Sequence, residues 1–153
     1  MKYTEIQKDL FEMPANYTFM QCISADFVMA AGIAVLFNQY YDIKNRLINA
    51  YGNGEKMWND PSHYELYTYN GFCIYEKPVL NLITKEYGNE MPTYKNLAAA
   101  LLHAKSIILQ NSITRIAMPK IGCGIDGLEW ERVSDIIKSI YEDLDVEIVV
   151  CYI

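Results

Sequence analysis

Residues 118–130 read MPKIGCGIDGLEW, a stretch that places three glycines within six residues directly after an apolar run. The run before the glycines, TRIAMPK at 114–120, has the composition of a short strand. After the glycines, apolar residues recur at helical steps, at Trp130, Val133, Ile137 and Tyr141. The stretch is therefore a glycine-rich loop between a strand and a helix, a connection typical of α/β sheets.

Strands and helices alternate through the rest of the chain. Runs rich in β-branched and aromatic residues predict strands at 2–7, 16–24, 64–69, 72–76, 79–85 and 146–153. Apolar residues at steps of three and four predict one helix through Ile33, Leu36, Tyr40, Ile43 and Leu47. A further helix, opened by Pro92-Thr93, has its apolar stripe at Leu97, Leu101, Ala104 and Ile108.

Two polar segments separate these elements. Asn70-Gly71 indicates a β-hairpin between the strands at 64–69 and 72–76, and the polar stretch 52–63 indicates a loop. Because buried-type strands follow helices along the chain, we expect a three-layer α/β/α sandwich with a central mixed β-sheet. Ligands of such sheets bind at the carboxyl ends of the strands.

Length and composition limit the function classes. The 153 residues, 52% hydrophobic and 21% charged, predict a single globular domain over 1–153, and we expect a monomer. The net charge of −6 argues against a general electrostatic grip on nucleic acid or membrane. No apolar run is long enough to span a bilayer and the first residues are polar, so we expect a cytoplasmic protein.

Cysteine and histidine usage argues against metal chemistry. The four cysteines show no C-x-x-C spacing, and only two histidines accompany them. We therefore expect neither a structural zinc site nor a disulfide framework, and no metal or other cofactor.

Three junctions are candidates for a site because each follows a strand: Ser24 to Ala34, Thr84 to Gly88, and Lys120 to Asp126. In the first and third, small residues and glycines precede a helix, where free backbone N–H groups can bind a phosphate. Ordinary tight turns are the alternative interpretation of both loops, and the spacing of the glycines alone favours it. Asp126 and Glu129 also have the spacing of a capping box, so Asp126 is a candidate helix cap.

Single residues at these junctions have two interpretations each. Lys85 is either a solvated lysine at the end of a strand or a partly desolvated amine that acts as a nucleophile. Cys123 is either small buried filler or a reactive thiol in a loop rich in N–H groups.

Three motifs, occurring in the same order and at the same distances, resemble the macro-domain family. They are QCISADFVMAAGIAVLF at 21–37, LITKEYGNEMPTYKNL at 82–97 and MPKIGCGIDGLEWERV at 118–133. The likeness covers nearly the whole chain, from Asp9 to the last strand. It is closest to the branch that contains terminal ADP-ribose protein glycohydrolase and the bacterial macro-domain antitoxins that remove ADP-ribose from DNA.

The resemblance implies roles for particular residues. Asp9 would read the adenine amino group with the backbone of Leu10 beside it, and Ser24 would lie near the distal ribose. The loop resembling MGAGIA would wrap the distal ribose and diphosphate through Gly32, Ile33 and Ala34. Thr84 would also contact substrate, and the diphosphate would be clamped by Ile121, Gly122, Cys123, Gly124 and Ile125.

The resemblance also implies a catalytic pair. Lys85 is similar to a lysine that attacks the anomeric carbon of the distal ribose and forms a covalent adduct. Asp126 is similar to the aspartate that acts as acid and base in that reaction. Physically, an amine can capture an anomeric centre and a nearby carboxylate can move the protons.

Several positions depart from the family pattern. Lys8 replaces the glycine that precedes the aspartate of the first motif, and Ala30 replaces a glycine of the first loop. The aromatic residue that stacks on adenine aligns with Cys151, whereas Tyr152 is one place further on and should point to the opposite face of the sheet. The insert at 52–63 has no clear family counterpart.

The resemblance predicts an ADP-ribose-binding hydrolase that releases ADP-ribose from an acidic side chain, from O-acetyl-ADP-ribose or from a nucleobase. Its expected partners are thus ADP-ribose and ADP-ribosylated protein or nucleic acid, with ADP-ribose as ligand or product rather than cofactor. The alternatives are a reader that binds ADP-ribose without catalysis and an ADP-ribose 1″-phosphate phosphatase.

Overall fold

The computed structural model describes residues 1–60 and 69–153. In these residues the strands are β1 Lys2–Gln7, β2 Thr18–Ser24, β3 Phe72–Glu76, β4 Val79–Lys85, β5 Arg115–Met118 and β6 Glu147–Tyr152. They form a sheet in the order β1-β6-β5-β2-β4-β3, in which neighbours run parallel except for the antiparallel pair β3 and β4. The mixed sheet predicted from the sequence is confirmed.

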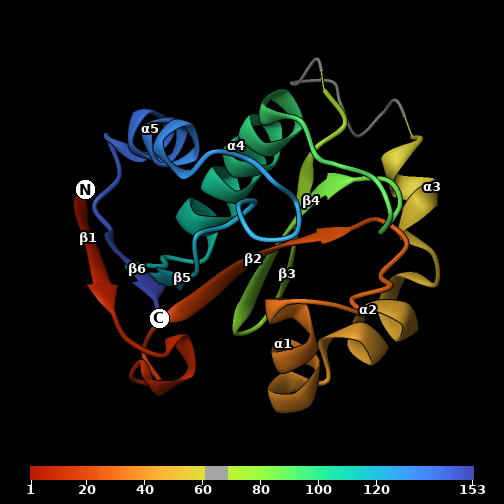
Figure 1. Cartoon of the computed structure of the whole chain (residues 1–153), viewed down its shortest axis with the longest axis horizontal. Coiled ribbons are helices and arrows are strands. Elements are labelled where there is room, and N and C mark those ends of the chain that lie inside the picture. Colours follow the sequence, from red (N-terminus) through yellow and green to blue (C-terminus); the bar gives the residue numbers. More distant parts are fainter. Residues whose placement is uncertain (61–68) are drawn as a thin grey trace.

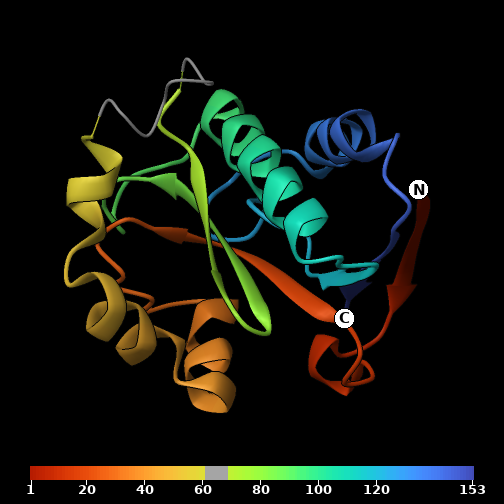
Figure 2. The same ribbon diagram turned by 180° about the vertical axis from the view of Figure 1, so that it is seen from behind.

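Helices cover both faces of this sheet. The described helices are α1 Ile33–Tyr41, α2 Ile43–Tyr51, α3 Gly54–Trp58, α4 Tyr94–Gln110 and α5 Trp130–Tyr141, with a 3-10 turn η1 at Leu10–Glu12. Figures 1 and 2 show α4 and α5 together on one side of the sheet and α1 and α2 on the other. This is the expected three-layer α/β/α architecture.

Alternation along the strands divides the interior into two cores. In β4, Leu80 and Leu82 pack in the core beneath α4 and α5, whereas Val79 and Ile83 pack in the core on the α1 and α2 side. All four side chains are fully buried. Because both faces are covered, β4 reads as a nearly continuous apolar run, as buried strands do.

One helix prediction and one loop prediction need correction. The single helix predicted through Ile33 and Leu47 is two helices, because Asp42 between them adopts a left-handed conformation with φ of +54°. The stretch 52–63, predicted as a loop, contains α3, whose first turn is capped by the Asn53 side chain accepting from the Glu55 N–H at 2.8 Å. Periodicity missed both features because Asp42 interrupts no apolar step and α3 is a short helix.

The hairpin prediction at Asn70-Gly71 is not tested, because its first strand at 64–69 lies almost entirely outside the described residues. The described hairpin joins β3 to β4 through Lys77-Pro78. Gly71 instead allows a close approach to α4, since a Cβ atom there would lie 1.8 Å from the carbonyl oxygen of Asn96.

The sheet order brings three loops together. β2 lies between β5 and β4, and all three strands are parallel, so their carboxyl ends share one edge of the sheet. The register of β2 and β4 slips at this edge, where Ser24 pairs with Lys85 and leaves Thr84 as an extra residue. Such a bulge redirects the side chains that follow it.

Candidate active site

A cavity of about 290 Å³ lies at this edge, between the loops that follow β2, β4 and β5. The cavity is lined by eleven of the predicted site residues: Ser24, Gly32, Ile33, Ala34, Lys85, Ile121, Gly122, Cys123, Gly124, Ile125 and Asp126. The structure thus brings together residues that the sequence places in three separate segments. We call this cavity the main cleft.

Lys85 and Asp126 form an ion pair in the main cleft. Lys85 Nζ lies 2.6 Å from Asp126 Oδ1 and donates a second hydrogen bond to the carbonyl oxygen of Gly88 at 3.3 Å. The two side chains are only 11% and 16% exposed. Lys85 is therefore partly buried and paired rather than a solvated lysine at the end of a strand, and its role as a nucleophile stays a prediction.

Asp126 does not cap the last helix. α5 begins at Trp130 with Glu129 as its N-cap residue and no side-chain cap hydrogen bond. The hydroxyl of Tyr94, from α4, accepts the Glu129 N–H at 2.9 Å instead. The carboxylate of Asp126 is thereby left for Lys85, and the capping-box interpretation is wrong.

The first wall of the main cleft is the start of α1. Gly32, its N-cap residue, has φ of +67° and ψ of −150°, a conformation that side-chain-bearing residues rarely adopt. This geometry turns the chain into the helix so that Ile33 and Ala34 line the cleft. No hydrogen bond between described residues uses their N–H groups, which can therefore bind an anion at the positive end of the helix.

The second wall is the glycine loop after β5. Gly122 has φ of +72°, and its carbonyl oxygen accepts the Leu128 N–H at 2.8 Å, which closes the loop. Within the described residues, the N–H groups of Gly124 and Ile125 have no hydrogen-bond acceptor. Two donors for the predicted nest are therefore available, although Gly124 itself does not adopt positive φ.

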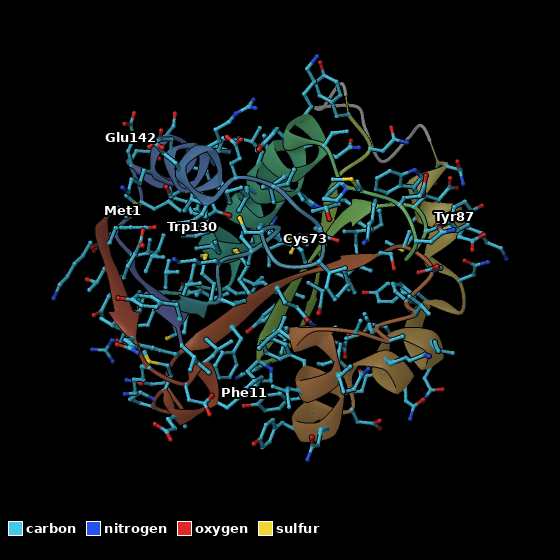
Figure 3. All side chains as sticks on the ribbon, viewed as in Figure 1. Met1, Phe11, Cys73, Tyr87, Trp130 and Glu142 are labelled. Atoms are coloured by element: carbon cyan, nitrogen blue, oxygen red, sulfur yellow. The ribbon has the colours of Figure 1, made fainter. Side chains whose placement is uncertain are left out.

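A second cavity of about 300 Å³ adjoins the main cleft and shares Ile33, Pro119 and Lys120 with it. Asp9 and Leu10, predicted to contact adenine, line this cavity. Aromatic packing holds their turn against α1. The ring centroid of Phe11, which is labelled in Figure 3, lies 5.0 Å from the ring centroid of Phe37 and 4.7 Å from that of Tyr40.

Cys151 and Tyr152 both line the second cavity at the end of β6. Side chains alternate along this strand, since Cys151 belongs to the core on the α1 and α2 side and Val150 to the core beneath α4 and α5. Cys151 is buried, while the ring of Tyr152 lies beneath Lys120 Nζ, 4.8 Å from the ring centroid. Lys120 therefore forms part of the passage between the two cavities, a position that its place in the motif did not reveal.

Thr84 differs from the other predicted contact residues. Its side chain is buried and does not line the main cleft, because the bulge turns it inward beside the Cys22 thiol. Burial, with Asp126 and Cys123 nearby, raises the pKa of the Cys22 thiol. Desolvation likewise raises the pKa of Cys123 to about 11, with Asp126 adding to the effect and Lys120 opposing it. Both cysteines are therefore neutral thiols near pH 7.

Several further residues line the main cleft without a role predicted from the sequence. Among them, Val28, Met29, Gly88 and Lys120 lie within the three candidate junctions, whereas Cys22 lies outside them. Gly88 lies in the loop after β4, which Figure 3 marks by its neighbour Tyr87 beside α3. Two signals could have given these positions a role: Asp26, whose side chain accepts from the N–H two residues on as in an Asx turn, and the glycine at position 88.

In the described part of the chain, no cluster of three or more His, Cys, Asp and Glu residues could hold a metal ion. None of the helices in these residues is both long and apolar enough to cross a membrane.

The amino-acid sequence is similar to that of known proteins. The family model for the macro domain matches residues 62–137. The chain is 37% identical to the ADP-ribose glycohydrolase OARD1 of Bos taurus over 149 residues, which cover 97% of this chain and 90% of that protein. The chain belongs to the macro-domain family.

More distant relatives share the fold of this macro domain. The DNA ADP-ribosyl glycohydrolase of Mycobacterium tuberculosis is 27% identical over 124 residues, which cover 80% of this macro domain and 34% of that protein. Among solved structures, the macrodomain of Thermus aquaticus DarG matches 99% of this chain and 97% of its own, with a TM-score of 0.76 at 20% identity. The latter similarity supports the fold.

Proposed function

We propose that this macro domain binds ADP-ribose and hydrolyses ADP-ribosyl linkages, with Lys85 as the nucleophile and Asp126 as the acid and base. The observation that carries the proposal is the 2.6 Å contact between Lys85 Nζ and Asp126 Oδ1 at a cleft lined with N–H donors. The names of the relatives, an ADP-ribose glycohydrolase and a DNA ADP-ribosyl glycohydrolase, agree with it.

The two adjoining cavities suit an elongated ligand. The diphosphate would lie between the N–H groups at the start of α1 and those of the glycine loop, since both sets of donors are available for an anion. The adenosine half would extend past Lys120 to Asp9 and Leu10 in the second cavity. The distal ribose would then reach Lys85 and Asp126 at the opposite end.

The first chemical step forms a bond from nitrogen to carbon. Asp126 accepts a proton from the Lys85 ammonium group and passes it to solvent. The lone pair of the neutral amine attacks the anomeric carbon C1″ of the distal ribose, and the bond from C1″ to the acceptor breaks with its electrons on the acceptor atom, which is oxygen in an acyl group and nitrogen in a nucleobase. The product of this step is a lysyl adduct of ADP-ribose.

The second step returns the enzyme to its starting state. Water attacks C1″ of the adduct while the Asp126 carboxylate removes a proton from the water. The bond from C1″ to Lys85 nitrogen breaks, and the proton on Asp126 moves to the departing amine. Free ADP-ribose and the Lys85–Asp126 ion pair result.

An acyl acceptor suits this site best among the three candidate linkages. A glutamyl or acetyl group leaves as a carboxylate and needs no proton, so Lys85 and one carboxylate suffice for the first step. A nucleobase leaves from nitrogen and needs proton donation at the same moment. We therefore propose that the main substrates are ADP-ribosylated acidic side chains and O-acetyl-ADP-ribose, and that an ADP-ribosylated nucleobase is hydrolysed more slowly.

The test compares the wild-type protein with the Lys85→Ala variant on glutamyl-ADP-ribosylated protein, on O-acetyl-ADP-ribose and on thymidine-linked ADP-ribosylated DNA. Release of ADP-ribose is measured, and the intact protein is weighed by mass spectrometry to detect the adduct. The wild type should act on at least the acyl substrates, and Lys85→Ala should be at least about 100-fold slower, the size of a lost nucleophile or acid–base group.

Lys105→Ala is the matched control, because Lys105 Nζ pairs with Asp143 Oδ1 at 2.7 Å on a surface outside the cleft. Its activity should equal that of the wild type. If the protein binds ADP-ribose with micromolar affinity but leaves all three substrates intact, the result would favour a protein that binds ADP-ribose without catalysis. Full activity of Lys85→Ala would rule out the covalent mechanism even if hydrolysis occurs.

We also propose that the protein acts as a monomer in the cytoplasm and without a cofactor. Its mass in solution, measured by light scattering, tests the monomeric state. Activity that survives dialysis against a chelator tests the independence from a metal cofactor.

A further inference from the structure

Asp26, in the loop after β2, accepts three hydrogen bonds from residues that line the main cleft. Its Oδ1 accepts from the Ser24 hydroxyl and from the Val28 N–H at 3.2 Å. Its Oδ2 accepts from the Gly88 N–H at 3.0 Å. One carboxylate oxygen thus serves its own loop, and the other reaches across to the loop after β4.

Gly88 connects Asp26 to the nucleophile. While its N–H donates to Asp26, its carbonyl oxygen accepts from Lys85 Nζ at 3.3 Å. The position of this carbonyl therefore depends on the carboxylate of Asp26. Together with the 2.6 Å contact to Asp126, it gives Lys85 Nζ two acceptors in two different loops.

The contact between the two loops is close. A Cβ atom at Gly88 would lie 2.4 Å from Cγ1 of Val28. The two loops also continue the hydrogen-bond ladder of β2 and β4 beyond the bulge. The N–H group of Ala25 donates to the carbonyl oxygen of Lys85 at 2.9 Å, and that of Asp26 to the carbonyl oxygen of Glu86 at 3.1 Å. By contrast, Tyr87 and Glu90 bond mainly to each other in a local turn.

We propose that Asp26 is a positioning residue for the reaction, acting through Gly88 to orient the amine of Lys85. The inference rests on the proposed function. A lysine side chain rotates freely about its Cε–Nζ bond when it has one partner. Two acceptors in different loops restrict this rotation to positions in which both are used, so the third position on nitrogen points in one direction. Once Asp126 has passed the proton to solvent, the amine turns until its two remaining N–H bonds donate to the same two acceptors, and the lone pair takes the third position.

Asp26→Asn isolates the contact that matters. Its Oδ1 can still accept from Ser24 and Val28, but its NH2 group faces the Gly88 N–H and cannot accept from it. We expect kcat to fall at least about tenfold, the cost of a misplaced reacting group, while the dissociation constant for ADP-ribose stays within about threefold.

Glu90→Gln is the matched control in the loop after β4. It makes the same change from carboxylate to amide, but its Oε1 can still accept the Tyr87 N–H, which lies 2.7 Å away in the wild type. Its kcat should stay within about twofold of the wild type, since a surface charge change away from the reacting groups has little effect on catalysis. An equal loss in Glu90→Gln and Asp26→Asn would assign the effect to loop charge and overturn the proposal.

A double-mutant cycle with Lys85→Ala separates positioning from general damage. If Asp26 acts through Lys85, Asp26→Asn should not slow the residual single-turnover hydrolysis of Lys85→Ala further. An equal slowing in both backgrounds, or a loss of ADP-ribose affinity as large as the loss of kcat, would overturn the proposal. If wild type and Lys105→Ala hydrolyse no linkage at all, the proposed function fails instead.

Gly88→Ala provides an independent approach to the same contact. The added methyl group would push Val28 and the loop after β4 apart, because there is no space for it. The same pattern of low kcat with nearly unchanged ADP-ribose affinity is expected, and normal turnover in this variant would contradict the proposed link through Gly88.

Discussion

At the scale of single residues, the proposed mechanism makes Asp126 the partner of Lys85 in both chemical steps. Asp126→Asn keeps the size of the side chain but removes the proton acceptor, so we expect hydrolysis to slow by about 10²- to 10⁴-fold. Binding of ADP-ribose, measured by calorimetry, should change little because Asp126 is not one of the N–H donors. A variant with weakened binding and normal turnover would contradict the role of Asp126 as acid and base.

Cys123 offers a prediction that depends on pH. Its pKa is raised to about 11, mainly by desolvation, so the reactive thiolate is scarce at neutral pH. Alkylation of Cys123 by iodoacetamide should therefore accelerate about tenfold for each pH unit between 7 and 10, and reach a plateau only above the pKa. Peptide mass spectrometry measures the rate, and ADP-ribose should protect the thiol. Rapid alkylation already at pH 7 would contradict the prediction.

Gly122 and Gly124 are two residues apart but should respond differently to substitution. Gly122 has φ of +72°, and a Cβ there would lie 3.0 Å from Leu128, whereas Gly124 has no positive φ and no atom within 4 Å of such a Cβ. Gly122→Ala should therefore destabilise the fold by about 1–2 kcal/mol, the cost of the left-handed region. Gly124→Ala should lie within about 0.5 kcal/mol of the wild type in urea unfolding.

At the scale of elements, the start of α5 depends on a side chain of α4. Tyr94→Phe removes the hydroxyl that accepts the Glu129 N–H but keeps the ring, which lies 3.8 Å from the Arg132 guanidinium carbon. The free energy of unfolding should fall by about 1 kcal/mol, as for a lost helix cap. Because the glycine loop ends at this point, ADP-ribose affinity should fall as well. Unchanged stability would show that water replaces the hydroxyl.

The architecture could be predicted from the sequence where elements are long and strongly periodic. Apolar steps located α4 and α5, and composition located β4 and β6, because burial on both faces leaves a clear mark on the residues. The break at Asp42 could not be predicted, since it arises from one residue in a left-handed conformation within an unbroken stripe. α3 is likewise too short to show a period.

The candidate site was predicted to a similar extent. Lys85 and Asp126 followed from the resemblance, and the structure brings them into contact. Asp26 was missed because its importance lies in hydrogen bonds to Val28 and Gly88, of which the second spans 62 positions of the chain. The bulge that buries Thr84 is equally invisible in sequence, since it is a property of how two strands pair.

At the scale of the whole molecule, the net charge of −6 should influence which acceptors are used. A DNA-linked substrate carries many more negative charges than O-acetyl-ADP-ribose and is repelled more strongly. Raising the salt from about 10 to 150 mM shortens the Debye length from about 30 to 8 Å. We therefore expect the ratio of kcat/KM on ADP-ribosylated DNA to kcat/KM on O-acetyl-ADP-ribose to rise with salt. A ratio that falls with salt would indicate a local basic contact with DNA.

The position of β2 between β5 and β4 also bears on how the protein is made. Lys85 and Asp126 are 41 residues apart in the chain and meet only when both neighbouring strands have paired with β2. During synthesis, Lys85 is added to the chain 41 residues before Asp126. The nascent chain therefore lacks the proposed catalytic pair, and we expect activity only when folding has joined the two halves of the sheet.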